Sequence, residues 1–93
     1  MTKLELAIDR ETRRMQCSGN EVTFEEPYTF TATSDKDTVT FLLGLHSGNP
    51  EQVLQSLLSV FPIPIRGSTK DVRGVPYVTL YIPKEKYNVT IHY

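Results

Sequence analysis

The chain has 93 residues and a net charge of −1, with 39% hydrophobic and 23% charged residues. This composition is typical of one soluble globular domain over residues 1–93, and the charge argues against a strongly basic nucleic-acid binder and an acidic DNA mimic. Because no apolar run approaches about 18 residues, no signal peptide is recognisable and Cys17 has no disulfide partner, we expect a cytoplasmic protein without a membrane span.

Residues 3–8 and 13–18 predict a first hairpin. Apolar and polar residues alternate in both segments, as in half-buried strands, and residues 9–12 are typical of a turn. A four-residue loop pairs Leu6 with Met15 and brings the apolar side chains of both strands onto one face.

Residues 28–33 and 38–45 predict a second hairpin, with Ala32 opposite Val39. Residues 22–24, which precede this hairpin, have two apolar residues at alternate positions and could be a strand or a connection.

As an alternative, residues 37–46 could be the first helix of a helical pair, because strand and helix are easily confused in short apolar runs. The β-branched residues Thr38, Val39 and Thr40 favour the strand.

One helix is predicted over residues 50–61. Asn49 suits its N-cap, Pro50 its first position and Gln52 a capping box, while the prolines after residue 61 end it. Apolar residues recur at helical spacing and form one stripe: Val53, Leu54, Leu57, Leu58 and Phe61.

A polar loop over residues 66–74 and a third hairpin, residues 75–82 with 87–93, complete the chain. Leu80 then faces Val89, and apolar faces match as in the other hairpins. The predicted fold is therefore α+β: a mainly antiparallel sheet of three hairpins in the order ββ-ββ-α-ββ, with the helix on its apolar face.

No set of residues typical of catalysis, metal binding or cofactor binding stands out, so we expect no enzyme, no metal and no cofactor. The one thiol, Cys17, faces the apolar side of its hairpin, and two histidines with one cysteine match no zinc spacing. An alternative keeps a small enzyme or anion-binding site near His46, where the chain enters the helix N-terminus.

Tyrosines and threonines on the outer face of the last hairpin predict a protein-binding surface. An apolar residue among the threonines of the second hairpin, and the final strand as a free sheet edge, add to it. The predicted partner-binding residues are Tyr77, Thr79, Tyr81, His92, Tyr93 and Leu42.

Two groups of basic residues give the alternative of a nucleic-acid contact module. They are Arg10, Arg13 and Arg14 near the first turn, and Arg66, Lys70 and Arg73 in the polar loop.

The first hypothesis is a non-enzymatic protein-interaction module without a small-molecule substrate. It is either a small inhibitor or adaptor on a larger protein machine or a subunit of a homo-oligomer. Small genes without catalytic motifs are common in phages, so a phage origin and the host cytoplasm are a background expectation that does not rest on these residues.

Overall fold

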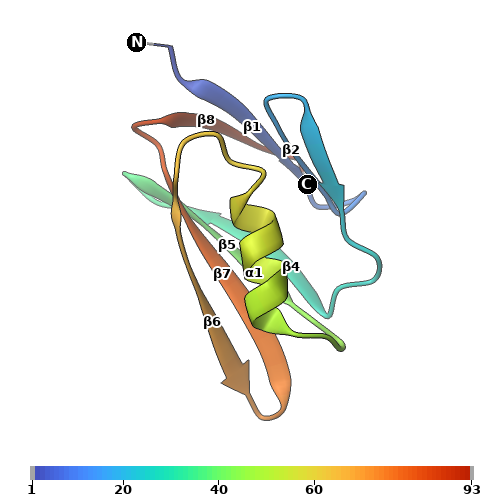
Figure 1. The fold of residues 1–93 in the computed structure, drawn as a ribbon. Coiled ribbons are helices and arrows are strands. Elements are labelled where there is room, and N and C mark those ends of the chain that lie inside the picture. Colours follow the sequence, from blue (N-terminus) through green and yellow to red (C-terminus); the bar gives the residue numbers. More distant parts are fainter. Residues whose placement is uncertain (1, 93) are drawn as a thin grey trace.

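The computed structural model describes residues 2–92, which form eight strands and one helix (Figure 1). The strands are β1 (Leu4–Asp9), β2 (Arg14–Cys17), β3 (Asn20–Thr23), β4 (Thr29–Ser34), β5 (Thr38–Gly44), β6 (Arg66–Val72), β7 (Val75–Pro83) and β8 (Tyr87–His92). Helix α1 (Pro50–Leu58) lies between β5 and β6 in the chain. The predicted α+β class is confirmed. Within residues 2–92 no helix has the length and apolar character needed to cross a membrane.

The strands form two four-stranded sheets. Sheet A has the order β3-β2-β1-β8 and sheet B the order β4-β5-β7-β6. Every strand pair is antiparallel except β1 with β8, which run parallel. The molecule is elongated, 42 × 24 × 24 Å along its principal axes.

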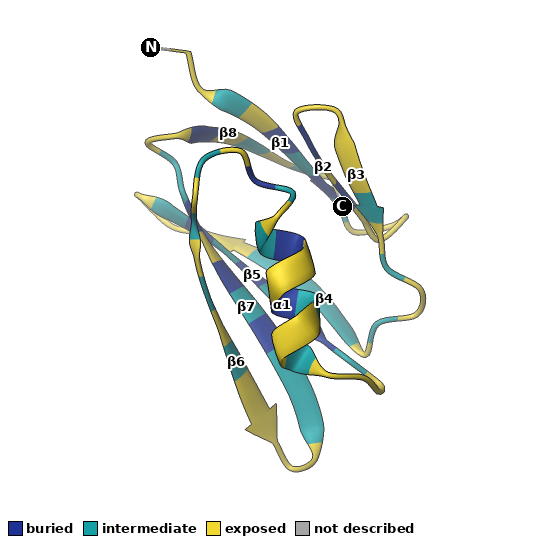
Figure 2. Cartoon of the chain, viewed as in Figure 1, coloured by how far each residue is buried: buried dark blue, intermediate teal, exposed yellow. Residues whose placement is uncertain are grey.

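One hydrophobic core joins both sheets and the helix, and its residues alternate with exposed ones along the strands (Figure 2). Sheet A contributes Leu6, Ile8, Met15, Cys17 and Tyr87; sheet B contributes Val39, Phe41, Leu43, Val78, Leu80 and Ile82; Leu54, Leu57 and Phe61 complete the core. Tyr87 also ties the segment after α1 to sheet A. Its hydroxyl donates to the Ile63 carbonyl at 2.6 Å and accepts from the Ile63 N–H at 3.0 Å.

The helix is confirmed, but it ends at Leu58 and not at Phe61. Asn49 caps it, with Oδ1 accepting from the N–H groups of Glu51 and Gln52. After Leu58 the backbone hydrogen bonds join residues three apart and not four, as the Phe61 N–H donates to the Leu58 carbonyl. The last turn is therefore tighter than an α-helix. Phe61 nevertheless stays buried in the core.

The first two hairpins are confirmed as pairs, whereas their predicted registers are wrong by two residues. Leu6 lies opposite Cys17, not Met15, and Ala32 lies opposite Phe41, not Val39. Side chains repeat every two residues along a strand, so this shift leaves the same residues on the same faces. Residues 20–23 are a strand, and 38–44 are a strand and not a helix.

The third hairpin is wrong. β7 pairs with β5 on one side and β6 on the other, so neither of its edges is free for β8. β8 crosses to sheet A and pairs in parallel with β1. The match of apolar faces that predicted the hairpin reports which side of a strand is buried, not which strand lies next to it.

The polar loop predicted over residues 66–74 is also wrong, because most of it is β6. β6 and β7 meet in a two-residue turn in which Arg73 and Gly74 have φ of 53° and 83°. Positive φ at both positions is the geometry that matches the twist of a tight hairpin. On the buried side of β6, Gly67 leaves room for α1: a Cβ there would lie 2.6 Å from Leu54 Cδ1.

Candidate functional site

The face of sheet B that points away from α1 is a continuous surface of hydroxyl and aromatic side chains, and we call it the Tyr–Thr face. Strand pairing places Thr79 opposite Leu42 and Tyr81 opposite Thr40. Its members are Thr29, Thr31, Thr33, Thr38, Thr40, Leu42, Tyr77, Thr79, Tyr81, Arg66, Ser68 and Lys70.

The tyrosine rings are held by their neighbours on the adjacent strands. Tyr77 lies opposite Gly44, and its Cε1 is 2.9 Å from the place where a side chain at position 44 would begin. The ring therefore leans across β5 toward Thr29. On the other side of β7, the Arg66 guanidinium lies over the Tyr81 ring, 5.8 Å from its centre, at cation–π distance.

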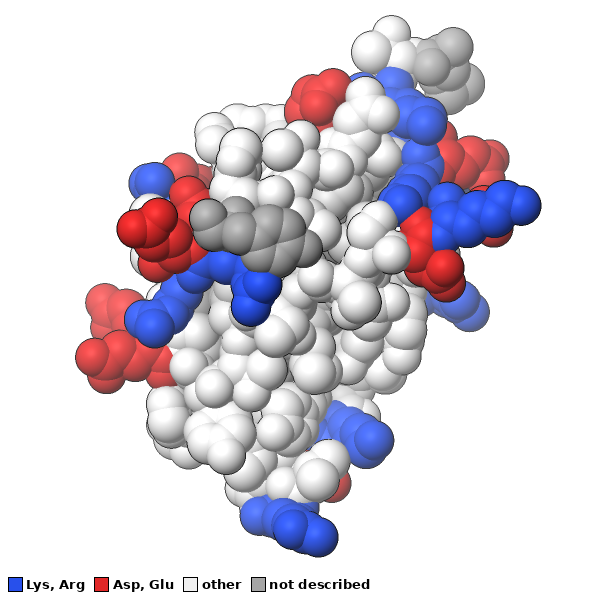
Figure 3. All heavy atoms as spheres, turned by 180° about the vertical axis from the view of Figure 1, so that it is seen from behind, with Lys and Arg blue, Asp and Glu red and all other residues white. Residues whose placement is uncertain are grey.

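The Tyr–Thr face carries no carboxylate, and its two cations both lie on β6, with Ser68 between them. Arg66 is opposite Tyr81 and Lys70 is opposite Tyr77. Seen from behind, the molecule has a broad surface with few charged side chains, and Lys, Arg, Asp and Glu gather around its margin (Figure 3). Such a charge-poor centre inside a charged margin is the usual pattern of protein interfaces.

The structure brings four of the predicted partner-binding residues together and separates His92 from them. Leu42, Tyr77, Thr79 and Tyr81 share the Tyr–Thr face. His92 does not join them, because β8 lies in sheet A, where His92 is opposite Asp9. Tyr93 lies outside the described residues, and β8 forms an edge of sheet A.

The two predicted basic groups belong to different sheets. Arg10, Arg13 and Arg14 surround the β1–β2 turn of sheet A, where Arg14 lies 3.7 Å from the Glu21 carboxylate. The other group lies on β6 and its turn to β7, so Arg66 and Lys70 belong to the Tyr–Thr face.

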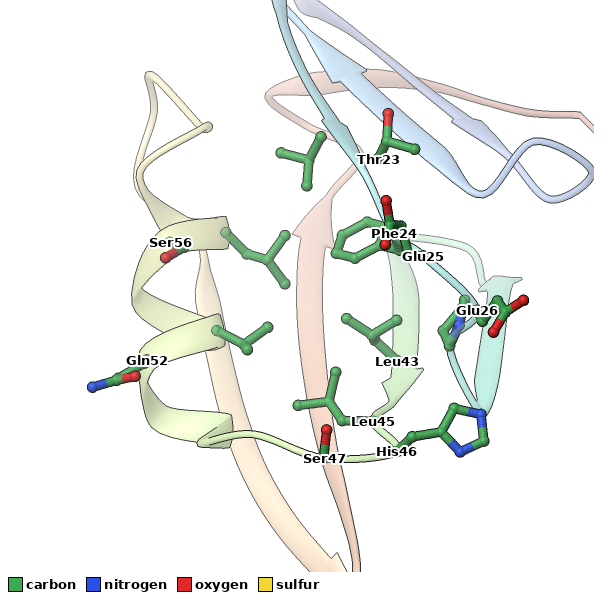
Figure 4. Close-up of a pocket in the computed structure, with 14 residues that line it drawn as sticks. Thr23, Phe24, Glu25, Glu26, Leu43, Leu45, His46, Ser47, Gln52 and Ser56 are labelled. Atoms are coloured by element: carbon green, nitrogen blue, oxygen red, sulfur yellow. The ribbon is translucent and has the colours of Figure 1, made fainter.

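A groove opens on the opposite side of sheet B, between α1 and the segment of residues 22–27. It has a volume of about 740 Å³. Phe24, Leu43 and Leu45 point into it, whereas Gln52 on α1 points away (Figure 4). His46 and Ser47 lie at the end of the groove where β5 leads into the helix.

The groove was not predicted from the sequence, since its residues come from connections as much as from strands. Phe24 follows β3, and its ring lies 5.6 Å from Phe30 and 6.1 Å from Phe41. An apolar residue at the end of a strand, such as Phe24, indicates a contact with the core, but it does not reveal which other strand it packs against.

The residues considered for catalysis lie apart. Cys17 is buried in the core, and this burial raises the pKa of its thiol. His46 is exposed at the groove end, where its ring meets Tyr28 edge-on at 5.6 Å. Residues 2–92 contain no group of three or more His, Cys, Asp or Glu side chains placed to hold a metal ion.

Comparison of the chain with protein-family models, with curated proteins and with solved structures finds no match.

Proposed function

We propose that this chain is a non-enzymatic protein-binding module that docks through the Tyr–Thr face. The partner is a larger protein whose surface offers uncharged contacts to Leu42, Tyr77 and Tyr81 and acidic side chains to Arg66 and Lys70. The observation that supports this most is the convergence of these five residues, from three strands, on one face without a carboxylate.

The size of the face favours a larger partner over a second copy of the chain. Four strands about 4.8 Å apart and about seven residues long cover roughly 450 Å² in projection, a small footprint for a stable interface, in which each partner buries about 800 Å² of accessible surface. Two flat copies would add little contact beyond this footprint. A larger protein can also reach the margins, including the β6–β7 turn.

The charge of the molecule favours a protein over a nucleic acid. Nucleic-acid binders neutralise many phosphates, while this face offers two cations on a chain of net charge −1. Tyrosine and arginine are also the residues that most often dominate binding energy at protein interfaces. Single-stranded nucleic acid is the second candidate, because a base can stack on an exposed tyrosine beside a cation, as Tyr81 is beside Arg66.

The test begins with a photo-crosslinking amino acid at Thr79, in the centre of the Tyr–Thr face, and the same residue at Gln55 on the exposed side of α1. We expect a discrete protein adduct from position 79 and none from position 55. The captured protein is then identified, purified and titrated with the wild-type chain.

In that titration, Tyr77→Ala with Tyr81→Ala should weaken binding by roughly 30-fold or more, the loss of at least about 2 kcal/mol typical of dominant interface residues. Tyr28→Ala is the matched control, since Tyr28 is more exposed, at 58%, and lies outside the face. Arg66→Glu with Lys70→Glu should weaken binding further at low salt.

Three results would refute the proposal. One is unchanged affinity of the double tyrosine variant. Another is a dimer in light scattering that the same variant dissociates, which assigns the face to self-association. The third is tight binding of a single-stranded oligonucleotide that falls steeply with salt, which favours the second candidate.

A further inference from the structure

We infer that the groove beside α1 is a binding site for a small organic cation, an apolar chain or ring that carries an ammonium group. This site is separate from the proposed docking face, because it lies on the α1 side of sheet B and the Tyr–Thr face lies on the other.

The interior of the groove is apolar. Leu43 and Leu45 form its floor at the end of β5, and Val53 and Leu57 of α1 form one wall. Phe24 closes the other wall, and its ring points into the space between them (Figure 4). Apolar contact with these side chains would hold the hydrocarbon part of a ligand.

The size and limits of the groove suit a compact molecule. Its volume of about 740 Å³ falls within the range of small-molecule sites. His46 and Ser47 bound it where the chain enters α1, and Val22 and Thr23 bound it toward sheet A. A groove bounded at both ends takes a short ligand more readily than a peptide that must enter and leave.

The negative charge at the rim of the groove favours a positively charged ligand. Glu25 and Glu26 line the groove, and no lysine or arginine does. Both glutamate side chains are exposed. An ammonium group at the rim would meet the negative charge of Glu25 beside an apolar interior, with the Glu26 carboxylate farther out and pointing away from the groove (Figure 4). A carboxylate group of equal size would be repelled.

The backbone that carries the two glutamates is fixed by a hydrogen bond on each side of them. Phe24 N–H donates to the Arg13 carbonyl at 2.9 Å, and Tyr28 N–H donates to the Gly44 carbonyl at 3.0 Å. The segment is thus anchored to sheet A at one end and to sheet B at the other, and the rim keeps its place over the groove.

The experiment compares n-octylammonium with octanoate, two probes of the same chain length and opposite charge, by NMR titration. We expect octylammonium to shift the methyl signals of Leu43, Leu45 and Val53 and to bind about 3- to 10-fold more tightly than octanoate, as exposed charge at the rim allows. Glu25→Gln with Glu26→Gln should remove this preference and leave the binding of octanoate unchanged or stronger.

A second pair of variants tests the location. Val53→Phe places a ring in the groove and should abolish binding of octylammonium. Gln55→Phe adds the same side chain on the exposed side of α1 and should leave binding intact. If Val53→Phe fails to fold, the methyl shifts of the wild-type chain decide the location.

The inference is overturned if the two probes bind equally, if neither binds, or if the shifted methyls lie outside the groove. Tighter binding of a basic amphipathic peptide than of octylammonium would also overturn it and assign the groove to a protein partner. None of these results depends on the Tyr–Thr face, so the inference and the proposed function fail independently.

Discussion

Replacing Gly67 with alanine tests how closely α1 lies on sheet B. A Cβ at position 67 would be 2.6 Å from Leu54 Cδ1, 3.1 Å from the Thr79 carbonyl oxygen and 3.2 Å from Leu80 Cδ2. Crowding of this kind in a packed core costs about 1–3 kcal/mol, partly offset by about 0.4–1 kcal/mol from the lower backbone entropy of unfolded alanine. We expect Gly67→Ala to lower the free energy of unfolding by about 1–2 kcal/mol.

The identity of the crowded atom gives the sharper test. Leu54→Val removes the reach of Cδ1 and alone costs about 1–2 kcal/mol, from lost apolar contact and lower helix propensity. In that background the new methyl group has space, so Gly67→Ala should cost about 1 kcal/mol less than in the wild-type chain. Urea unfolding followed by circular dichroism measures all four proteins of the cycle.

Leu57→Val is the matched control for this cycle. Leu57 is also buried on α1, but it is not among the three nearest neighbours of a Cβ at position 67. Gly67→Ala should therefore keep its full cost in the Leu57→Val background. Additivity of Gly67→Ala with Leu54→Val to within about 0.5 kcal/mol, or equal relief by Leu54→Val and Leu57→Val, would show that α1 does not sit over β6 as described.

Three further changes have expected outcomes. Tyr87→Phe removes the hydroxyl that bonds the Ile63 N–H and carbonyl, and it should lower the free energy of unfolding in urea by about 1–3 kcal/mol; an unchanged midpoint contradicts this. Glu26→Gly should raise the free energy of unfolding by about 1 kcal/mol, because Glu26 has a φ of 45°, which is strained for a residue with a side chain. A lower melting temperature of this variant would contradict that reasoning. Asp9 has a lowered pKa, chiefly because its carboxylate accepts a hydrogen bond from the Thr12 N–H. The stability that this carboxylate adds above its unfolded pKa of about 3.9 should be lost as the pH falls below that value. The Asp9→Asn variant should therefore lose less stability than the wild-type chain over the same acid titration.

Sequence alternation predicts the faces of the strands well, and it predicts their neighbours poorly. Leu6, Phe41 and Leu80 are buried on the expected faces, although the first two hairpins are shifted by two residues. Partner choice depends on contacts between distant segments, such as β5 with β7, which are separated in the chain by α1 and β6.

β6 was missed because its buried side lacks the apolar residues that mark a strand. Gly67 and Thr69 occupy that side, since α1 lies too close for larger groups at position 67. The local signal was the Arg73-Gly74 pair, which suits a two-residue hairpin turn. Reading that turn would have placed β6 beside β7 and left no room there for β8.

The candidate site was partly predictable, because alternation along a strand reveals which of its residues share a face. Tyr77, Thr79 and Tyr81 share a face because they alternate along a single strand, which the sequence reveals directly. The contribution of Leu42 and the lean of Tyr77 across Gly44 require the pairing of β5 with β7. The glycine was a usable hint, because a glycine within a strand often marks a close approach of another group.

The parallel pairing of β1 with β8 has a consequence for how the chain folds. The Asn88 amide donates to the Glu5 carboxylate at 3.1 Å across 83 residues, so this ladder closes almost the whole chain. The β1–β2, β4–β5 and β6–β7 hairpins are local and carry a small loop-closure cost, whereas this closure is slow and gains nothing until both strands are in place. The meeting of the first and last strands is therefore the step that converts separately forming hairpins into one cooperative unit.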